Sequence, residues 1–199
     1  MNRMQAGELA EHAGRLLRQR GETVSVAEGS AGGLVSAALL AGCFPAFDWR
    51  ESRPEASGAT MLFPCRPDRH ERNVQVAATA LRMRLHSCKA ADFTFSLSVA
   101  DAVDPLEVVP LLLALRRHAI GNVEGTAAVL PPPNIPGATP NPESRFLRID
   151  GRLPDGRPVV LHAAFFVKGL RVYQATVIGP GEWPRRESLD TFFSAIRVA

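Results

Sequence analysis

The sequence lacks an apolar run long enough to cross a bilayer, and it lacks a run of one charge. A spanning helix needs about 20 consecutive apolar residues, and the longest candidate, residues 32–43, is shorter. The 23 Lys and Arg residues are scattered among 20 Asp and Glu residues, so the formal net charge of +3 gathers in no basic stripe. The sequence therefore predicts no membrane-spanning helix and no nucleic-acid partner.

Cysteine is scarce, with only Cys43, Cys65 and Cys88 in the chain. If Cys43 carries a lipid, an even pair remains, and Cys65 with Cys88 is a candidate disulfide in an oxidising compartment. A cytosolic location predicts three reduced, buried thiols instead. Zinc is a further alternative, with Cys65 and His70, or His86 and Cys88, as candidate ligands. Because no two histidines have the spacing of a metal motif, we favour the disulfide and expect no metal.

The patterns of familiar active sites are missing as well. The glycine-containing residues 28–33 have neither the lysine of a Walker motif nor the glycine spacing of a dinucleotide site. Asp101 and Asp104 flank an expected helix start, where carboxylates normally cap the helix. Tyr173 lies within an expected strand, where a packing role is favoured. The sequence thus predicts no cofactor and no nucleophile with a base beside it.

What the sequence does contain is an export-like signal. Leu40-Ala41-Gly42-Cys43 matches a lipobox, in which small residues precede a cysteine that receives lipid. The apolar residues 32–43 have the length of a signal-peptide core, although the acidic residues upstream are unusual for a leader. This pattern predicts lipid attachment at Cys43 and an envelope location on a membrane surface. If residues 1–43 are retained, a cytoplasmic location is expected instead.

Residues 1–43 also support a second interpretation. Residues 5–19 have helical periodicity, residues 23–27 are typical of a strand, and residues 34–40 can begin a helix. The intervening turn exposes the N–H groups of a helix start, which is an anion-binding arrangement. Its candidate binding residues are Gly29, Ser30, Gly32 and Gly33. Ser30 is favoured as a helix N-cap over a nucleophile.

The segment LLRQRGETVSVAEGSAGGLVSAALLA resembles the opening of the CinA C-terminal domain, the nicotinamide-nucleotide amidase family. Ala27, Glu28, Gly32 and Gly33 match the family motif by position. The motif serine and threonine fall on Gly29 and Ala31, and Ser30 is one place away, which makes it a weak catalytic candidate. The resemblance covers residues 5–41, about a quarter of that domain, and implies shared ancestry for this segment.

After residue 43 the pattern changes. Residues 44–58 are expected to be a linker, and residues 59–199 an α+β domain: an antiparallel sheet with two packed helices. The expected polar turn is 68–73, and residues 131–142 form a proline-rich loop. The expected strands are 59–63, 74–78, 81–88, 93–99, 145–150, 158–167 and 170–178. The expected helices are 104–121 and 185–198.

The segments FPCRPDRHERNV, AAFFVKGLRVYQATVIGP and DTFFSAIRV resemble a group of uncharacterised proteobacterial envelope lipoproteins with PsbP-like order of strands and helices. The resemblance spans residues 39–199 and implies an exported, lipid-anchored domain without a known activity. We therefore favour a non-enzymatic interaction or structural domain of the envelope. The alternatives are a relative of the nicotinamide-nucleotide amidases, incomplete or fused near residues 38–43, and a ligand-binding module that uses the sheet face.

Overall fold

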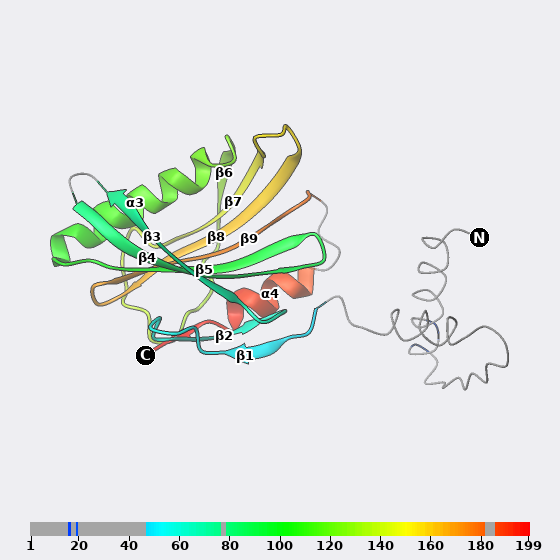
Figure 1. Ribbon diagram of the computed structural model, residues 1–199, viewed down its shortest axis with the longest axis horizontal. Coiled ribbons are helices and arrows are strands. Elements are labelled where there is room, and N and C mark those ends of the chain that lie inside the picture. The colour runs from blue at the N-terminus through cyan, green and yellow to red at the C-terminus, as the bar shows by residue number, and fades with distance from the viewer. Residues whose placement is uncertain (1–15, 17–18, 20–46, 77–78, 182–185) are drawn as a thin grey trace. The chain divides into compact units, whose positions relative to one another are not determined.

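A computed structural model of the chain describes residues 16, 19, 47–76, 79–181 and 186–199 (Figure 1). The chain divides into two compact units, Met1–Ala46 and Phe47–Ala199. In the first unit, Leu16 and Gln19 are described, and both are helical. The expected helix–strand–helix, its glycine turn, Ser30 and Cys43 lie outside the described residues. The fold below is that of the second unit.

A seven-stranded antiparallel sheet, called here the large sheet, forms the centre of this unit. Its strand order is β3-β4-β5-β9-β8-β7-β6. The strands are β3 (Asp68–Val76), β4 (Thr79–Ala90), β5 (Phe93–Asp101), β6 (Thr126–Leu130), β7 (Arg145–Arg152), β8 (Pro158–Lys168) and β9 (Arg171–Gly179). Gly169, with φ of 57°, and Leu170 form the two-residue loop between β8 and β9. A glycine is favoured there because the loop needs a positive φ.

The helix α3 (Pro105–Gly121) covers one face of the large sheet. Asp104 caps it, since its carboxylate accepts a hydrogen bond from the Leu106 backbone N–H at 2.7 Å. Pro105 fits the first turn because a proline lacks only an N–H that has no helical partner there. Leu111, Leu112 and other apolar residues at helical spacing then pack on the sheet.

The opposite face is covered by a short helix and a small sheet, which together use both ends of the second unit. They are α4 (Arg186–Ser194) and a small sheet of order β1-β2-β10, with strands β1 (Arg50–Ser52), β2 (Ala59–Phe63) and β10 (Arg197–Val198). Figure 1 shows α3 on one side of the large sheet and α4 with β1 and β2 on the other. Neighbouring residues of β5 and β9 point to opposite faces, so these strands contribute to the cores on both sides of the sheet.

The α+β class with antiparallel sheets is confirmed, and several boundaries differ from expectation. The expected linker 44–58 contains β1, and Phe47 and Trp49 pack against Phe95 with ring centroids 5.8 and 5.9 Å away. The short range of β1 and its charged residues hid it from period-based reasoning. The segment is part of the folded unit from Phe47 onward.

Three other differences have the same origin, which is strand pairing at the border of a sheet. The expected turn 68–73 is the first part of β3, an edge strand, and these six residues are polar and exposed. The strand β6 forms the other edge and is largely exposed. The last helix ends at Ser194 rather than Val198, because Arg197 and Val198 pair with Thr60 and Ala59 of β2.

Candidate binding groove

A groove of about 950 Å³ opens between α4 and the end of the large sheet formed by β6, β7 and β8. Ligand sites of proteins typically fall between about 300 and 1,000 Å³ and combine an apolar lining with a few polar groups. The groove has this composition: Phe146, Val160, Leu189 and Phe193 supply apolar surface, and Arg148 and His162 supply polar groups. It is the best candidate binding site among the described residues.

Aromatic rings form the floor of the groove. The ring of Phe146 on β7 lies 4.7 Å from that of Phe193 on α4, measured between centroids. The imidazole of His162 on β8 lies 6.3 Å from Phe146. Phe193 is buried and belongs to the core under α4, so it holds the floor in place. The floor is therefore a rigid apolar surface that belongs to the core itself.

The proline-rich segment forms one wall, through Pro131, Pro133 and Pro136. Its position is set by backbone hydrogen bonds: Val198 N–H donates to the Pro136 carbonyl at 3.0 Å. Thr139 N–H donates to the Val167 carbonyl at 2.8 Å. Proline restricts the backbone further, since its ring fixes φ. The wall is thus pre-formed and needs little ordering when a ligand enters.

Gly137 shows how closely this wall approaches β10. Its φ is 86°, and an added Cβ would lie 1.8 Å from the carbonyl oxygen of Val198. Only glycine combines that positive φ with so close a backbone contact. Gly137 therefore permits the hydrogen bond between Pro136 and Val198 that fixes the wall.

Charged groups stand around the apolar floor. Arg148 and Arg197 line the groove, with Asp190 as the acidic residue among the described lining residues. Arg148 bonds Asp150, two residues away on β7, with 2.8 Å between Nη2 and Oδ1. This hydrogen bond lowers the pKa of the Asp150 carboxyl. The lining therefore carries more positive than negative charge.

His162 lies directly opposite Arg148 in the pairing of β7 with β8. Burial lowers the pKa of the His162 imidazole, and the charge of Arg148 lowers it further. The imidazole is therefore neutral at neutral pH and can take part in hydrogen bonding without adding charge.

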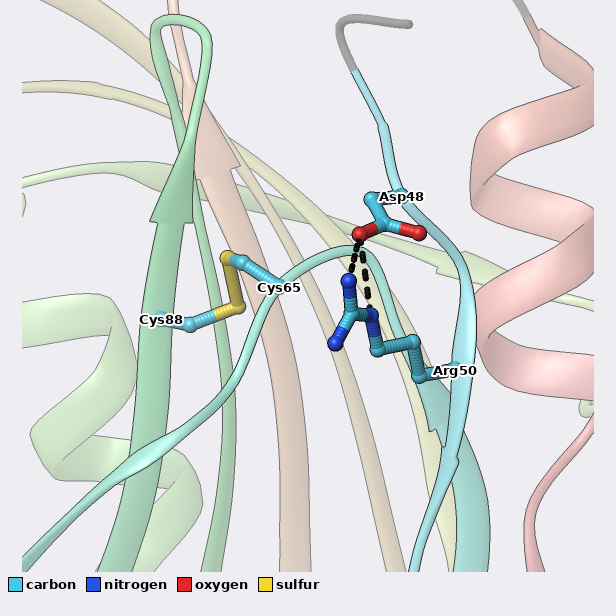
Figure 2. Close-up of a disulfide and its surroundings, with 4 residues drawn as sticks. All are labelled: Asp48, Arg50, Cys65 and Cys88. Atoms are coloured by element: carbon cyan, nitrogen blue, oxygen red, sulfur yellow. Dashed lines mark hydrogen bonds and ion pairs between the residues drawn. A yellow bond between two sulfur atoms is a disulfide. The ribbon is translucent and has the colours of Figure 1, made fainter. Parts of the chain in front are cut away.

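The predicted cysteine pair lies elsewhere, at the junction of the two sheets. Cys65 follows β2 and Cys88 belongs to β4, and the structure joins them in a disulfide with Cα atoms 6.0 Å apart (Figure 2). The disulfide ties the small sheet to the large one. Asp48 and Arg50, which hydrogen bond to each other, lie near this junction in Figure 2. With both cysteines in the disulfide, neither offers a thiolate to zinc, and no group of three potential metal ligands occurs in the described segments.

A group of polar contacts lies at Tyr173 and at the neighbouring ends of β4, β5 and β9. The Tyr173 hydroxyl donates to the Ser57 carbonyl at 2.8 Å, and its ring stacks on Phe166. Asp101 accepts hydrogen bonds from Arg84 at 2.5 Å and Arg171 at 2.6 Å. Burial would raise the pKa of Asp101, but the two arginines together hold it below its ordinary value. We assign this cluster a structural role, because its charges are paired and its hydroxyl is satisfied.

An exposed apolar patch lies at the start of α3. Val103 is 79% exposed, Leu106 83% and Leu170 41%. The Ala102 N–H donates to the Leu170 carbonyl at 2.9 Å, which brings the hairpin of β8 and β9 beside the helix start. The patch is open surface, and it is a second place where apolar molecules can adhere.

Sequence reasoning did not identify the groove. Its lining comes from the end of β6, the proline-rich segment, β7, β8, α4 and β10, so no local spacing marks it. The one available signal was the density of prolines in 131–142, which predicted a loop but not what the loop borders. Ser30, Gly29, Gly32, Gly33 and Cys43 all lie outside the described residues, so those site predictions stay predictions.

Comparison of the chain with protein-family models and with curated proteins found no match. The described helices include none with the length and apolar character of a membrane span.

Proposed function

We propose that this chain is an exported binding domain without catalytic activity, held on a membrane surface by lipid on Cys43. The observation that carries the binding role is the pre-formed groove under α4, with an apolar floor and a wall fixed by backbone hydrogen bonds. A site of this kind binds with little loss of conformational entropy, because its walls are already ordered.

The export part of the proposal is supported by two independent features. The lipobox Leu40-Ala41-Gly42-Cys43 places a modifiable cysteine shortly before the folded unit. The disulfide between Cys65 and Cys88 is the kind of bond that persists in oxidising compartments. Resemblance to envelope lipoproteins with a PsbP-like fold remains part of this proposal.

Location is tested by determining the N-terminus and mass of the protein after membrane and soluble fractions of a bacterial host are separated. We expect a membrane-bound product that begins at lipid-modified Cys43, and a Cys43→Ser variant that lacks the lipid mass. A soluble product that retains Met1 would contradict the anchor.

The binding role is tested with Nile red, an uncharged dye that fluoresces in apolar surroundings. We expect saturable binding that is blocked by Ser194→Trp, because Ser194 is an exposed residue of α4 that lines the groove. His118→Trp, at an exposed position of α3, is the matched control. Dye binding that survives Ser194→Trp but is lost in Leu106→Gln would place the dye on the apolar patch and contradict the groove.

A nicotinamide-nucleotide amidase relative is the second candidate, favoured by the match of Ala27, Glu28, Gly32 and Gly33 to that family's motif. Its test is deamidation of nicotinamide mononucleotide by the full chain, with Ser30→Ala as control. We expect no turnover. Turnover that disappears in the variant would overturn the non-catalytic proposal.

A further inference from the structure

The charges around the groove indicate what kind of ligand it accepts. We propose that the groove binds amphipathic anions, with an alkyl chain on the aromatic floor and the anionic head held by Arg148 and Arg197. This inference rests on the proposed binding role and adds the chemical class of the ligand.

The apolar surface of the groove is where the alkyl chain would pack. Phe146 and Phe193 form its centre, with ring centroids 4.7 Å apart, and Val160 and Leu189 extend it toward β8 and α4. An alkyl chain that packs on this surface removes water from the chain and from the rings, and this burial of apolar surface favours binding. A polar ligand without a chain would leave the floor unpartnered.

Both arginines of the groove have N–H donors for the anionic head. Arg148 uses Nε and Nη2 to bond Asp150, which leaves Nη1 without a hydrogen bond to any described residue. Arg197 donates from Nη1 to the Ala195 carbonyl at 3.0 Å, and its Nε and Nη2 have no hydrogen bond to the part of the chain that the structure describes. A guanidinium has five N–H donors in a planar fork, so both arginines can add a carboxylate or phosphate oxygen without losing their present partners.

Arg148 can shift toward a ligand at little cost in stability. Its pair with Asp150 is solvent-exposed, with 45% and 55% of the two side chains accessible. Exposed pairs of this kind contribute little stability, so a shift of the guanidinium toward a ligand is inexpensive. Asp150 is not among the described residues that line the groove.

Negative charge is sparse in the lining of the groove. Among the described lining residues, Asp190 is the one carboxylate, and it stands on α4 against two arginines. His162 is neutral at neutral pH and lies beside the Arg148 position on the neighbouring strand. Arg148 and Arg197 would repel a cationic head, whereas they can donate hydrogen bonds to an anionic head.

The experiment is displacement of Nile red from the full chain by three ligands with the same chain, each below its micellar concentration. They are dodecanoate, 1-dodecanol and dodecyltrimethylammonium. We expect dodecanoate to bind about tenfold more tightly than the alcohol, because its head makes charge-assisted hydrogen bonds. We expect the cation to bind more weakly than both. Dodecyl phosphate as a fourth ligand shows whether the site prefers a carboxylate or a phosphate head.

The variants assign the effect to the groove. Arg148→Gln should reduce dodecanoate affinity about tenfold and dodecanol affinity much less, since the charge-assisted contact is made by dodecanoate alone. Arg157→Gln is the matched control, because Arg157 also bonds an aspartate two residues away but does not line the groove. It should change neither affinity.

The outcomes separate the inference from the proposed function. Equal binding of dodecanoate and dodecanol, both blocked by Ser194→Trp, would overturn the preference for anions while the groove remained a binding site. Equal losses in Arg148→Gln and Arg157→Gln would also overturn it, because the effect would then be one of net charge. Failure of Nile red itself to bind would contradict the proposed binding role.

Discussion

The two faces of the large sheet solve the same packing problem in different ways. On the α3 face, one continuous helix covers an aliphatic core built from Leu111, Leu112 and their neighbours; among its described buried residues, Phe165 is the one aromatic side chain. The α4 face has an aromatic core centred on Phe95 and Phe192. Its cover combines β1 and β2 from the start of the second unit with α4 and β10 from its end.

This difference explains why the groove lies where it does. A helix as long as α3 can cover the central strands without interruption. The nine residues of α4 and the short strands of the small sheet cover only part of the opposite face. At the β6–β8 end, the proline-rich segment borders the sheet without filling the space above it. A cover made of separate pieces thus leaves a cavity that a single long element closes.

The largest loss of stability is expected when one large side chain is removed from each face of the large sheet. Phe192→Ala should destabilise the protein by about 3–5 kcal/mol and Leu112→Ala by about 2–5 kcal/mol, because both side chains are fully buried. Phe192 contacts Phe193 with ring centroids 5.2 Å apart, so its loss should also weaken Nile red binding. Leu112→Ala should leave dye binding unchanged. Chemical denaturation and dye titration check both; equal loss of dye binding would mean that the faces are not independent.

The disulfide ties the pieces of the α4 face together, and its loss should cost about 3 kcal/mol. That estimate follows from closing a loop of 23 residues in the unfolded chain. Reduction of the wild type and the double variant Cys65→Ala/Cys88→Ala should give the same shift in the urea midpoint. A double variant that is insensitive to reductant but as stable as the oxidised wild type would contradict a stabilising bond.

Alanine substitutions at Gly137 and Gly121 test the covers of the two faces in the same way. Gly137→Ala should cost more than about 1 kcal/mol and weaken dye binding, because the added Cβ meets the Val198 carbonyl at a positive φ. Gly121→Ala, at the end of α3, meets no atom within 4 Å and should be neutral or slightly stabilising. Thermal unfolding and dye titration measure both. A neutral Gly137→Ala would show that the wall is not held as described.

The smallest of these effects is expected from acid, which should lower the free energy of unfolding through protonation of His86. Burial and then the charge of Arg69 lower the pKa of His86. The unfolded chain therefore takes up a proton near pH 6.5 while native His86 stays neutral, and stability falls as pH drops below that value. His86→Gln should flatten the stability profile between about pH 7 and 5. His70→Gln, at an exposed position on β3, shows whether loss of any histidine does the same.

Local chemistry in the sequence was sufficient for the elements that close a core. The capped helix from Asp104 and the alternating strand 93–99 were predictable, since burial on one face imposes a period. The first part of β3, residues 68–73, was not, because its residues are polar and exposed and so show no period of burial. The groove was not predictable either, because Arg148, His162 and Phe193 meet only after β7, β8 and α4 have packed.

The most direct test of the account is Nile red titration of the wild type and of Ser194→Trp, with His118→Trp alongside. We predict saturable binding to the wild type and to His118→Trp, and its loss in Ser194→Trp. Equal binding to all three proteins would contradict the claim that the incompletely covered α4 face carries the binding site.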